Sequence, residues 1–170
     1  QMGLLVKIGL LFDGNKLGFS ENSFLQYDIA PENIGSGCYF LAWPTGHDYI
    51  VGFIGGRFAW NLSKQGEDEV VEYALSKLVN LSGSNIRKHF LKGFASDWAS
   101  NPLTKGSYSA VKPGYYGARE LLNEPIAEKL IFAGEATAGD LAGLVNGAYE
   151  SGKMAATRIS NIIKLKNKSL

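Results

Sequence analysis

The residue best suited to chemistry near the start of the chain is a lysine inside an apolar run. Lys7 interrupts residues 4–12, which are otherwise almost continuously apolar. A lysine buried in such a strand costs free energy unless its amine reaches solvent, a partner or a substrate. Two interpretations are open: an alternating strand on which Lys7 faces water, as most lysines do, or an active-site amine.

A second candidate is the segment that begins at Trp98 and reaches the run Gly-Ser-Tyr at residues 106–108. Aromatic residues on a loop can wall a pocket by stacking and attract cations through their ring faces. Alternatively, Trp98 and Tyr108 pack in a small core beneath the loop. The sequence leaves both interpretations open.

A third candidate is the glycine turn in residues 130–137, which is followed by a helical pattern from residues 143–145 onward. An apolar strand that passes through Gly134 into a helix start gathers unpaired N–H groups and a positive dipole end, where an electron-rich ring or phosphate binds. Glu135 would accept ribose hydroxyl hydrogen bonds there, or would only favour the helix start. No Gly-x-Gly-x-x-Gly fingerprint follows any strand, so the segment predicts half of a dinucleotide site.

The elements that position these residues follow from apolar spacing. Short β-type runs separated by Gly and Pro predict a strand meander, and they occupy residues 4–12, 24–29, 38–43 and 49–54. Helical spacing after an acidic first turn predicts a helix that starts near residue 67 and ends near residues 80–83.

The second half of the chain alternates loops with two strong patterns. Residues 88–98 predict a strand, and residues 99–117 predict a loop rich in Gly, Ser, Pro and Tyr. Residues 130–133 predict the final strand. Residues 144–163 predict a long helix, and the small residues at its front must lie against something close.

Charge and cysteine content exclude several classes of protein. The 170 residues carry 17 basic and 16 acidic side chains, and only the helix end at residues 164–168 is densely basic, so binding to nucleic acid or membrane is not expected. Cys38 cannot form an internal disulfide, and His47 and His89 lack metal-ligand spacing with it. We therefore expect no metal site and a reducing, cytoplasmic location.

Taken in this order, the segments resemble the C-terminal portion of the flavin-containing amine oxidases, a family that includes monoamine oxidases, polyamine oxidases and histone lysine demethylases. Residues 2–12 resemble the family strand that carries a lysine. Residues 98–114 resemble its Trp, Asp-Pro and Gly-Ser-Tyr-Ser stretch, and residues 130–156 resemble its Phe-Ala-Gly-Glu-x-Thr and Gly-Ala-x-x-Ser-Gly signature. The three motifs in one order are specific, whereas any one alone would not be.

The resemblance assigns a role to each candidate. It implies that Lys7 is the catalytic lysine, linked through a water to the flavin N5, and that Tyr108 and Ser107 belong to the substrate pocket. The FAD-binding residues that it implies are Trp98, Gly134, Glu135, Gly143, Leu144 and Val145.

Three departures from the family pattern refine these expectations. Ser107 stands where monoamine oxidases carry the cysteine that binds FAD covalently, which implies non-covalent FAD. Leu144 aligns with the second tyrosine of the monoamine oxidase pocket, so the chain is more similar to polyamine oxidases. Asn101 replaces the usual aspartate, which leaves the contacts of that aspartate in question.

The fold class implied is α+β. Residues 1–117 would form the later part of a substrate-binding domain, with a mixed, largely antiparallel sheet and a packed helix. Residues 118–170 would supply the final strand and C-terminal helix of a Rossmann-like FAD-binding domain whose glycine-rich half is absent.

The implied function is oxidation of an amine by hydride transfer to the flavin, with imine hydrolysis and production of H2O2. The partners would be an amine substrate, O2 and the remaining N-terminal part of the enzyme, and we expect the isolated chain to be inactive. Two alternatives remain: a flavoprotein of the same architecture with a non-amine substrate, such as a desaturase or porphyrinogen oxidase, or a non-catalytic interaction domain.

Overall fold

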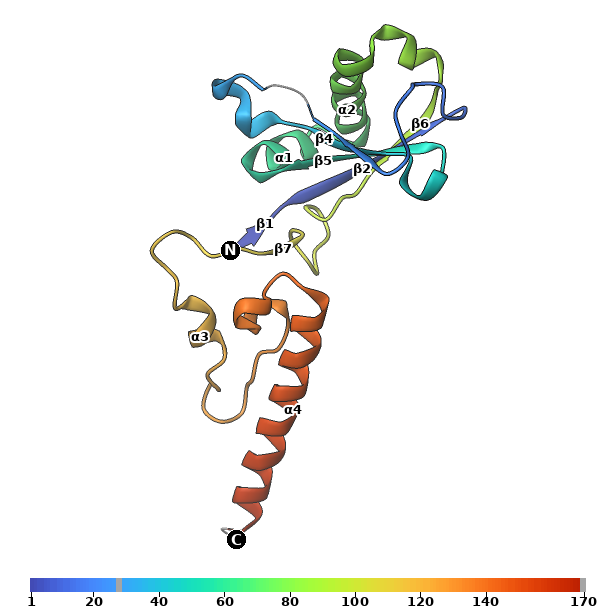
Figure 1. The fold of residues 1–170 in the computed structure, drawn as a ribbon. Helices are drawn as coiled ribbons and strands as arrows, with labels where there is room; N and C mark the ends of the chain where they lie inside the picture. Colours follow the sequence, from blue (N-terminus) through green and yellow to red (C-terminus); the bar gives the residue numbers. More distant parts are fainter. Residues whose placement is uncertain (27–28, 169–170) are drawn as a thin grey trace. The chain divides into compact units, whose positions relative to one another are not determined.

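The chain divides into two compact units. The structure is a computed structural model that describes residues 1–26 and 29–168 (Figure 1). The sheet unit comprises Gly3–Ser107, and the tail unit comprises Gln1–Met2 together with Tyr108–Leu170. The chain therefore divides after Ser107, whereas the resemblance implied a boundary after residue 117.

A five-stranded sheet organises the sheet unit, with the strand order β3-β4-β5-β2-β6. Each pair of neighbouring strands is antiparallel. The strands are β2 (Leu5–Phe12), β3 (Ser23–Leu25), β4 (Tyr39–Ala42), β5 (Tyr49–Gly55) and β6 (Phe90–Ala95). The meander predicted from residues 24–54 is confirmed, and β2 then pairs between β5 and β6.

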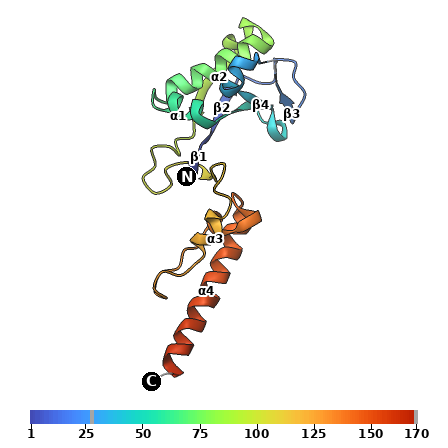
Figure 2. The same cartoon turned by 90° about the vertical axis from the view of Figure 1, so that its left-hand side faces the viewer.

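Two helices cover one face of this sheet (Figure 1), and Figure 2 shows them from a second side. They are α1 (Gly56–Ser63) and α2 (Glu67–Ser82). Every second residue of β2 is buried against them, from Val6 to Phe12, because side chains of a strand alternate between faces. Close packing is clearest at Gly93, where an added Cβ would lie 2.2 Å from Cγ1 of Val71 in α2.

Some local predictions for the sheet unit need correction. β2 alternates between a buried and an open face, whereas its sequence suggested a continuously buried strand. The strand predicted at residues 24–29 ends at Leu25, and residues 27–28 lie outside the described residues. The helix α1 was not predicted, because no capping side chain marks its start and its eight residues are too few for a clear helical pattern. Short 3-10 turns occupy Pro31–Ser36, Pro44–Gly46 and Ser84–Lys88.

The tail unit has few regular elements besides one long helix. β7 (Tyr108–Ser109) pairs with β1 (Met2–Gly3), and α3 (Ala118–Leu122) follows. Two 3-10 turns, Glu135–Thr137 and Gly139–Leu141, lead into α4 (Val145–Lys168). The long C-terminal helix is therefore confirmed.

The final strand predicted at residues 130–133 is wrong. In the part of the chain that the structure describes, this segment makes only an isolated bridge between Leu130 and Ile126. An apolar run becomes a strand only when a neighbouring strand supplies hydrogen-bond partners, and apolar spacing alone cannot report that.

Candidate functional site

The face of the sheet opposite the helices is open and largely apolar. Strand register places one row of residues directly across it: Phe24, Leu41, Val51, Gly9 and Phe94. Phe24 is 76% exposed and Phe94 is 64% exposed. We call the side of the sheet that carries this row the open face. An exposed apolar surface of this kind marks a contact site for a ligand or for other protein.

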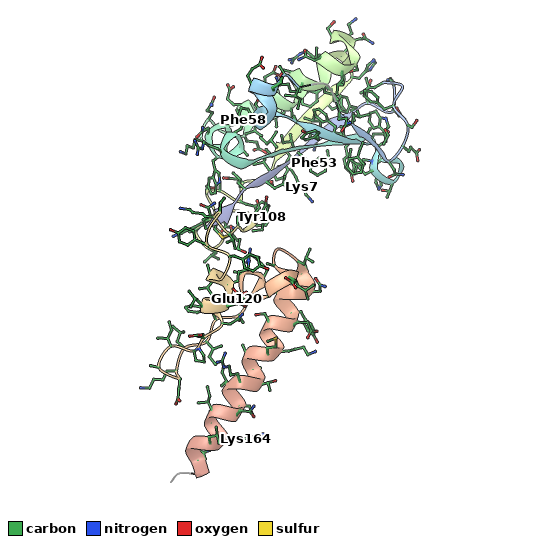
Figure 3. All side chains as sticks on the ribbon, turned by 60° about the vertical axis from the view of Figure 1, so that its left-hand side comes forward. Lys7, Phe53, Phe58, Tyr108, Glu120 and Lys164 are labelled. Atoms are coloured by element: carbon green, nitrogen blue, oxygen red, sulfur yellow. The ribbon has the colours of Figure 1, made fainter. Side chains whose placement is uncertain are left out.

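Lys7 lies on the open face. It pairs across β2 and β5 with Phe53, which in turn pairs with Tyr39 of β4. Figure 3 shows the Lys7 side chain on the side of the sheet away from the helices. Among the described residues no carboxylate forms an ion pair with Lys7. The structure thus gives an exposed amine on an apolar surface, in agreement with the water-facing interpretation of this strand.

The loop after β6 is hydrogen-bonded at one end to β2 and at the other end to β1 and the first residue of β2. At one end, the N–H of Ser96 donates to the Lys7 carbonyl at 2.9 Å, and the Lys7 N–H donates to Oγ of Ser96 at 3.0 Å. At the other end, the N–H of Ser107 donates to the Gly3 carbonyl at 2.9 Å. The backbone of β1 and β2 therefore closes the loop between these two serines.

The hydroxyl of Ser107 also hydrogen-bonds to β2 at this end of the loop. Oγ accepts a hydrogen bond from the Leu5 N–H at 3.0 Å and donates to the Leu5 carbonyl at 2.9 Å. The hydroxyl thus satisfies both backbone groups of Leu5, as a neighbouring strand would. Its predicted place in the substrate pocket stays a prediction.

Within the loop, Trp98 is 46% exposed, and its carbonyl accepts from the N–H of Gly106 at 2.9 Å. Oδ1 of Asn101 accepts from the N–H of Leu103 at 2.9 Å. This is the contact that an aspartate would also make in an Asx turn. Asparagine therefore keeps the local turn at the position where the family has aspartate.

In the tail unit, Glu135 is the centre of a hydrogen-bond network. Its Oε1 accepts from the Ser109 N–H at 2.7 Å, and its Oε2 accepts from Oγ of Ser109 at 2.8 Å and from the Gly143 N–H at 2.7 Å. Nη1 of Arg119 donates to Oγ of Ser109 at 2.6 Å and to the Ala136 carbonyl at 2.9 Å. The carboxylate of Glu135 therefore connects the turn after Gly134 to the approach to α4.

These contacts lower the pKa of Glu135 from its usual value of 4.5. Partial burial is the largest single effect and raises the pKa. The hydrogen bonds from Ser109 and Gly143, with the positive charge of Arg119, together outweigh it. Glu135 is consequently a carboxylate at neutral pH.

A second polar cluster joins the start of this turn to α4. Oγ of Ser151 accepts from the Gly134 N–H at 3.1 Å and lies 2.5 Å from Oγ1 of Thr137. Thr137 and Ser151 are both buried. The Gly-Glu-x-Thr turn and the middle of the Gly-Ala-x-x-Ser-Gly signature are therefore in contact through hydroxyls.

The start of α4 presents its backbone to solvent. Leu144 is half exposed and Val145 is 90% exposed. The N–H of Gly143 donates to Glu135, and the N–H of Leu144 donates to the Leu141 carbonyl at 3.2 Å. The first N–H groups of α4 itself, from Val145 on, have no acceptor within the helix. Gly147 must lack a side chain, because a Cβ there would lie 2.2 Å from the carbonyl oxygen of Leu141.

These residues fit the flavin that the resemblance implies. An exposed helix N-terminus suits an electron-rich ring edge. A carboxylate has about four acceptor sites, and Glu135 uses three of them on protein groups, which leaves one for a ribose hydroxyl.

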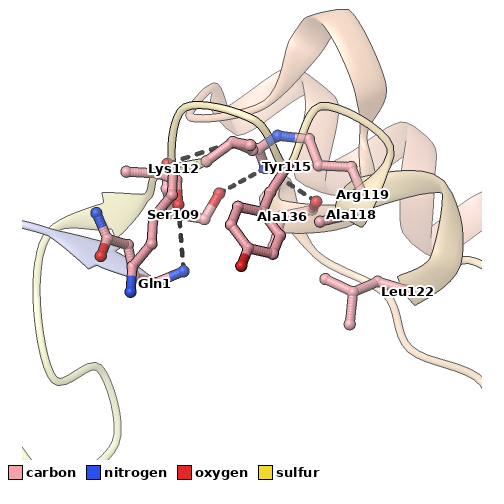
Figure 4. A pocket seen from close by; sticks show the side chains of 10 residues that line it. Gln1, Ser109, Lys112, Tyr115, Ala118, Arg119, Leu122 and Ala136 are labelled. Carbon is pink, nitrogen blue, oxygen red and sulfur yellow. Dashed lines mark hydrogen bonds between the residues drawn. The ribbon is translucent and has the colours of Figure 1, made fainter.

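A cavity of about 330 Å³ lies beside Arg119 within the tail unit (Figure 4). Val111, Tyr115 and Leu122 supply apolar walls, and Figure 4 shows Arg119 reaching Ser109 and Ala136. Tyr108, the predicted pocket tyrosine, is 40% exposed. Sequence reasoning missed Arg119 and Ser109, because neither residue stands in a periodic pattern or in a charge arrangement that distinguishes it from its neighbours.

Other candidate chemistry finds little support in the residues that the structure describes. No three His, Cys, Asp or Glu side chains gather there as a metal site would require. Burial raises the pKa of Cys38 to about 12, so its thiol is unreactive. No described helix is both long and apolar enough to cross a membrane.

Comparisons with known proteins agree on one family. The family model described as flavin containing amine oxidoreductase matches residues 1–160. Polyamine oxidase 5 of Oryza sativa subsp. japonica is 35% identical over 159 residues, which cover 91% of this chain and 31% of that protein. Lysine-specific histone demethylase 1 homolog 2 of Arabidopsis thaliana is 29% identical over 165 residues, covering 94% of this chain and 22% of that protein. The chain thus spans less than a third of the length of these relatives.

Proposed function

We propose, since this chain belongs to the family of flavin-containing amine oxidoreductases, that the complete protein is an FAD-dependent amine oxidase. The sheet unit would contribute part of the substrate-binding domain. The tail unit would contribute the last part of a Rossmann-like FAD-binding domain, which in the complete protein also needs a glycine-rich phosphate-binding turn.

When bound, the flavin would supply the redox chemistry, namely oxidation of the amine to an imine, which water hydrolyses, with O2 as the final acceptor of two electrons and two protons to give H2O2. The residues of this chain would orient the amine, exclude water and hold charge. The apolar open face suits the first two tasks, because it offers a dry surface beside one amine group.

Lys7 is the proposed catalytic residue. Its exposed amine has no carboxylate partner in the described part of the chain, so it is available to hold a water by hydrogen bonding at the flavin N5. Trp98 would lie beside the ring, and Tyr108 would wall the amine pocket through its exposed ring.

The start of α4 is the proposed flavin-edge element. The amides at Leu144 and Val145 would stabilise negative charge at the pyrimidine edge of the ring, and Gly134, Glu135 and Gly143 would contact the rest of the FAD. Ser107 has a hydroxyl where a covalent link needs a thiol, which supports non-covalent FAD.

The observation that carries this proposal is the unpaired lysine on an apolar open face in a chain of this family. We predict that Lys7→Met in the complete protein slows flavin reduction or reoxidation about 100-fold or more, while FAD stays bound. Stopped-flow absorbance would measure the two half-reactions separately.

Lys92→Met is the matched control. Lys92 is exposed and lies on the same face, since it pairs with Leu11 across β2 and β6. Its removal subtracts the same charge and should leave both half-reactions unchanged. Equal rates for Lys7→Met and the unsubstituted protein in both half-reactions would refute the role of Lys7.

A further inference from the structure

Gly9 lies in the interior of β2, a position at which glycine is unfavourable. A glycine in a strand weakens it, and the usual reasons are a bulge, a special backbone conformation, or the close approach of a ligand or another backbone. The only register shift between β2 and its neighbour β6 falls between Leu11 and Phe12. The φ angle of Gly9 also lies outside the left-handed region. The first two reasons therefore do not apply.

The space at Gly9 differs from the space at Gly52 and Gly93, two other glycines inside strands of the sheet. A Cβ at Gly93 would clash with Val71, and a Cβ at Gly52 would lie 3.3 Å from Sγ of Cys38, so close packing explains both. A Cβ at Gly9 would meet no atom within 4 Å. Nothing in the described chain requires the missing side chain.

Gly9 lies on the same face as Lys7. The two residues are one strand repeat apart, about 7 Å, because residues i and i+2 point to the same side. Val51 and Phe94 flank Gly9 in the cross-strand row, one on each neighbouring strand. The missing side chain thus leaves a gap with apolar walls next to the proposed catalytic amine.

Charge on the open face restricts what can fill this gap. The five strands of the sheet contain no Asp or Glu. The charged side chains on these strands are Lys7 and Lys92, which are both cationic. An ammonium group over Gly9 would lose water without gaining a counter-ion, whereas a hydrocarbon group would be favoured there.

We infer that Gly9 is a specificity-determining residue, and that the gap above it receives an uncharged hydrocarbon segment of the amine substrate. The substrate class is then an amine whose apolar chain or ring reaches past Lys7 to Gly9, which lies one strand repeat, about 7 Å, further along β2. This inference rests on the proposed function and names the substrate of that same site.

The test compares three amines on the complete flavin-loaded protein: propylamine, 4-phenylbutylamine and spermidine. The variants are Gly9→Val, which fills the gap, and Gly9→Ala, which fills it less. Valine is favoured in strands and meets no atom there, so both variants should fold. Gly35→Ala is the control, because it also adds a Cβ in open space but lies outside the sheet.

We expect Gly9→Val, which adds three carbon atoms, to raise KM for 4-phenylbutylamine about ten-fold or more, since one extra methylene-sized group in an apolar pocket already changes specificity by about that factor. Gly9→Ala should give a smaller increase. The kinetics of propylamine, which is too short to reach Gly9, should stay within about two-fold. The anaerobic increase in unfolding temperature on addition of 4-phenylbutylamine should shrink in parallel.

Three outcomes would overturn the inference. One is an unchanged KM for 4-phenylbutylamine in Gly9→Val, and another is an equal loss for 4-phenylbutylamine and propylamine. The third is a clear preference of the unsubstituted protein for spermidine that Gly9→Val leaves intact. If the unsubstituted protein oxidises none of the amines and none raises its unfolding temperature, the proposed function itself fails, which is a distinguishable result.

Discussion

The two units of the chain are stabilised in different ways. The sheet unit has a continuous apolar core of buried side chains beneath α1 and α2. In the described part of the tail unit, the buried side chains are Thr137 and Ser151, and both are polar. One unit is stabilised mainly by burial of apolar area, and the other mainly by hydrogen bonds.

This difference indicates which parts of the proposed site are rigid. Lys7 and Gly9 lie on a strand whose other face is buried, so their positions are set by the core. The turn at Gly134 and the start of α4 depend on a few polar contacts, while many apolar side chains of the tail unit are exposed. Regions with few buried contacts open at low free-energy cost, so we expect the flavin-edge element to be the more easily disturbed.

The largest effect on stability should come from the core of the sheet unit. Ile8 is fully buried. We predict that Ile8→Ala lowers the free energy of unfolding by about 2–5 kcal/mol, through lost burial and the cavity left behind. Urea unfolding followed by tryptophan fluorescence measures it, since Trp43 lies in the same core.

The control for that prediction is Phe24→Ala on the open face. Phe24 is mostly exposed, so its truncation should change the free energy of unfolding by less than about 0.5 kcal/mol. If the two substitutions lowered the free energy of unfolding equally, the open face would be packed in solution, and the distinction between the two faces would be wrong.

A smaller effect is expected from the polar cluster of the tail unit. Ser151→Ala removes the acceptor of the Gly134 N–H and a partner of Thr137. The cost should be about 1–3 kcal/mol, confined to the tail unit, because buried polar groups lose their partner. Hydrogen exchange should rise in peptides from residues 134–151 and stay unchanged in β2. Equal protection of residues 134–151 in both proteins would contradict this account.

The smallest effect should be the pH dependence contributed by Glu135. Its folded pKa lies below the usual 4.5, so its contribution to stability is complete above that value and is lost as pH falls through the lowered folded pKa. Glu135→Gln should destabilise the tail unit at neutral pH by about 1 kcal/mol, after allowance for solvent screening. The difference between variant and parent should vanish in acid, and hydrogen exchange against pH would measure it. A stability difference between variant and parent that grew in acid would show that folding raises the pKa of Glu135 instead of lowering it.

Much of the sheet unit could be predicted from the sequence. Apolar runs separated by Gly and Pro marked β2, β4 and β5, and acidic first-turn residues marked α2. The order of strands could not be predicted, because pairing of β2 with both β5 and β6 depends on contacts distant in sequence. The family predicted from three ordered motifs is confirmed by the match over residues 1–160.

The candidate site was only partly predictable. Lys7 and Glu135 stood out by type, since each is charged within or just after an apolar run. The bonds that orient Glu135 come from Ser109, Arg119 and Gly143, which lie in loops and have no periodic signal. Gly9 likewise looked like an ordinary strand residue until the register identified its neighbours.

The closure of the loop after β6 has a consequence for how this protein can diversify. Both ends of the loop are hydrogen-bonded to the first strands, through Ser96 at Lys7 of β2 and through Ser107 at Gly3 of β1 and Leu5 of β2. Changes in length or composition between these serines are therefore absorbed within the loop, without displacing the lysine. The segment between these serines can therefore change in length during evolution or design while Lys7 keeps its position on β2.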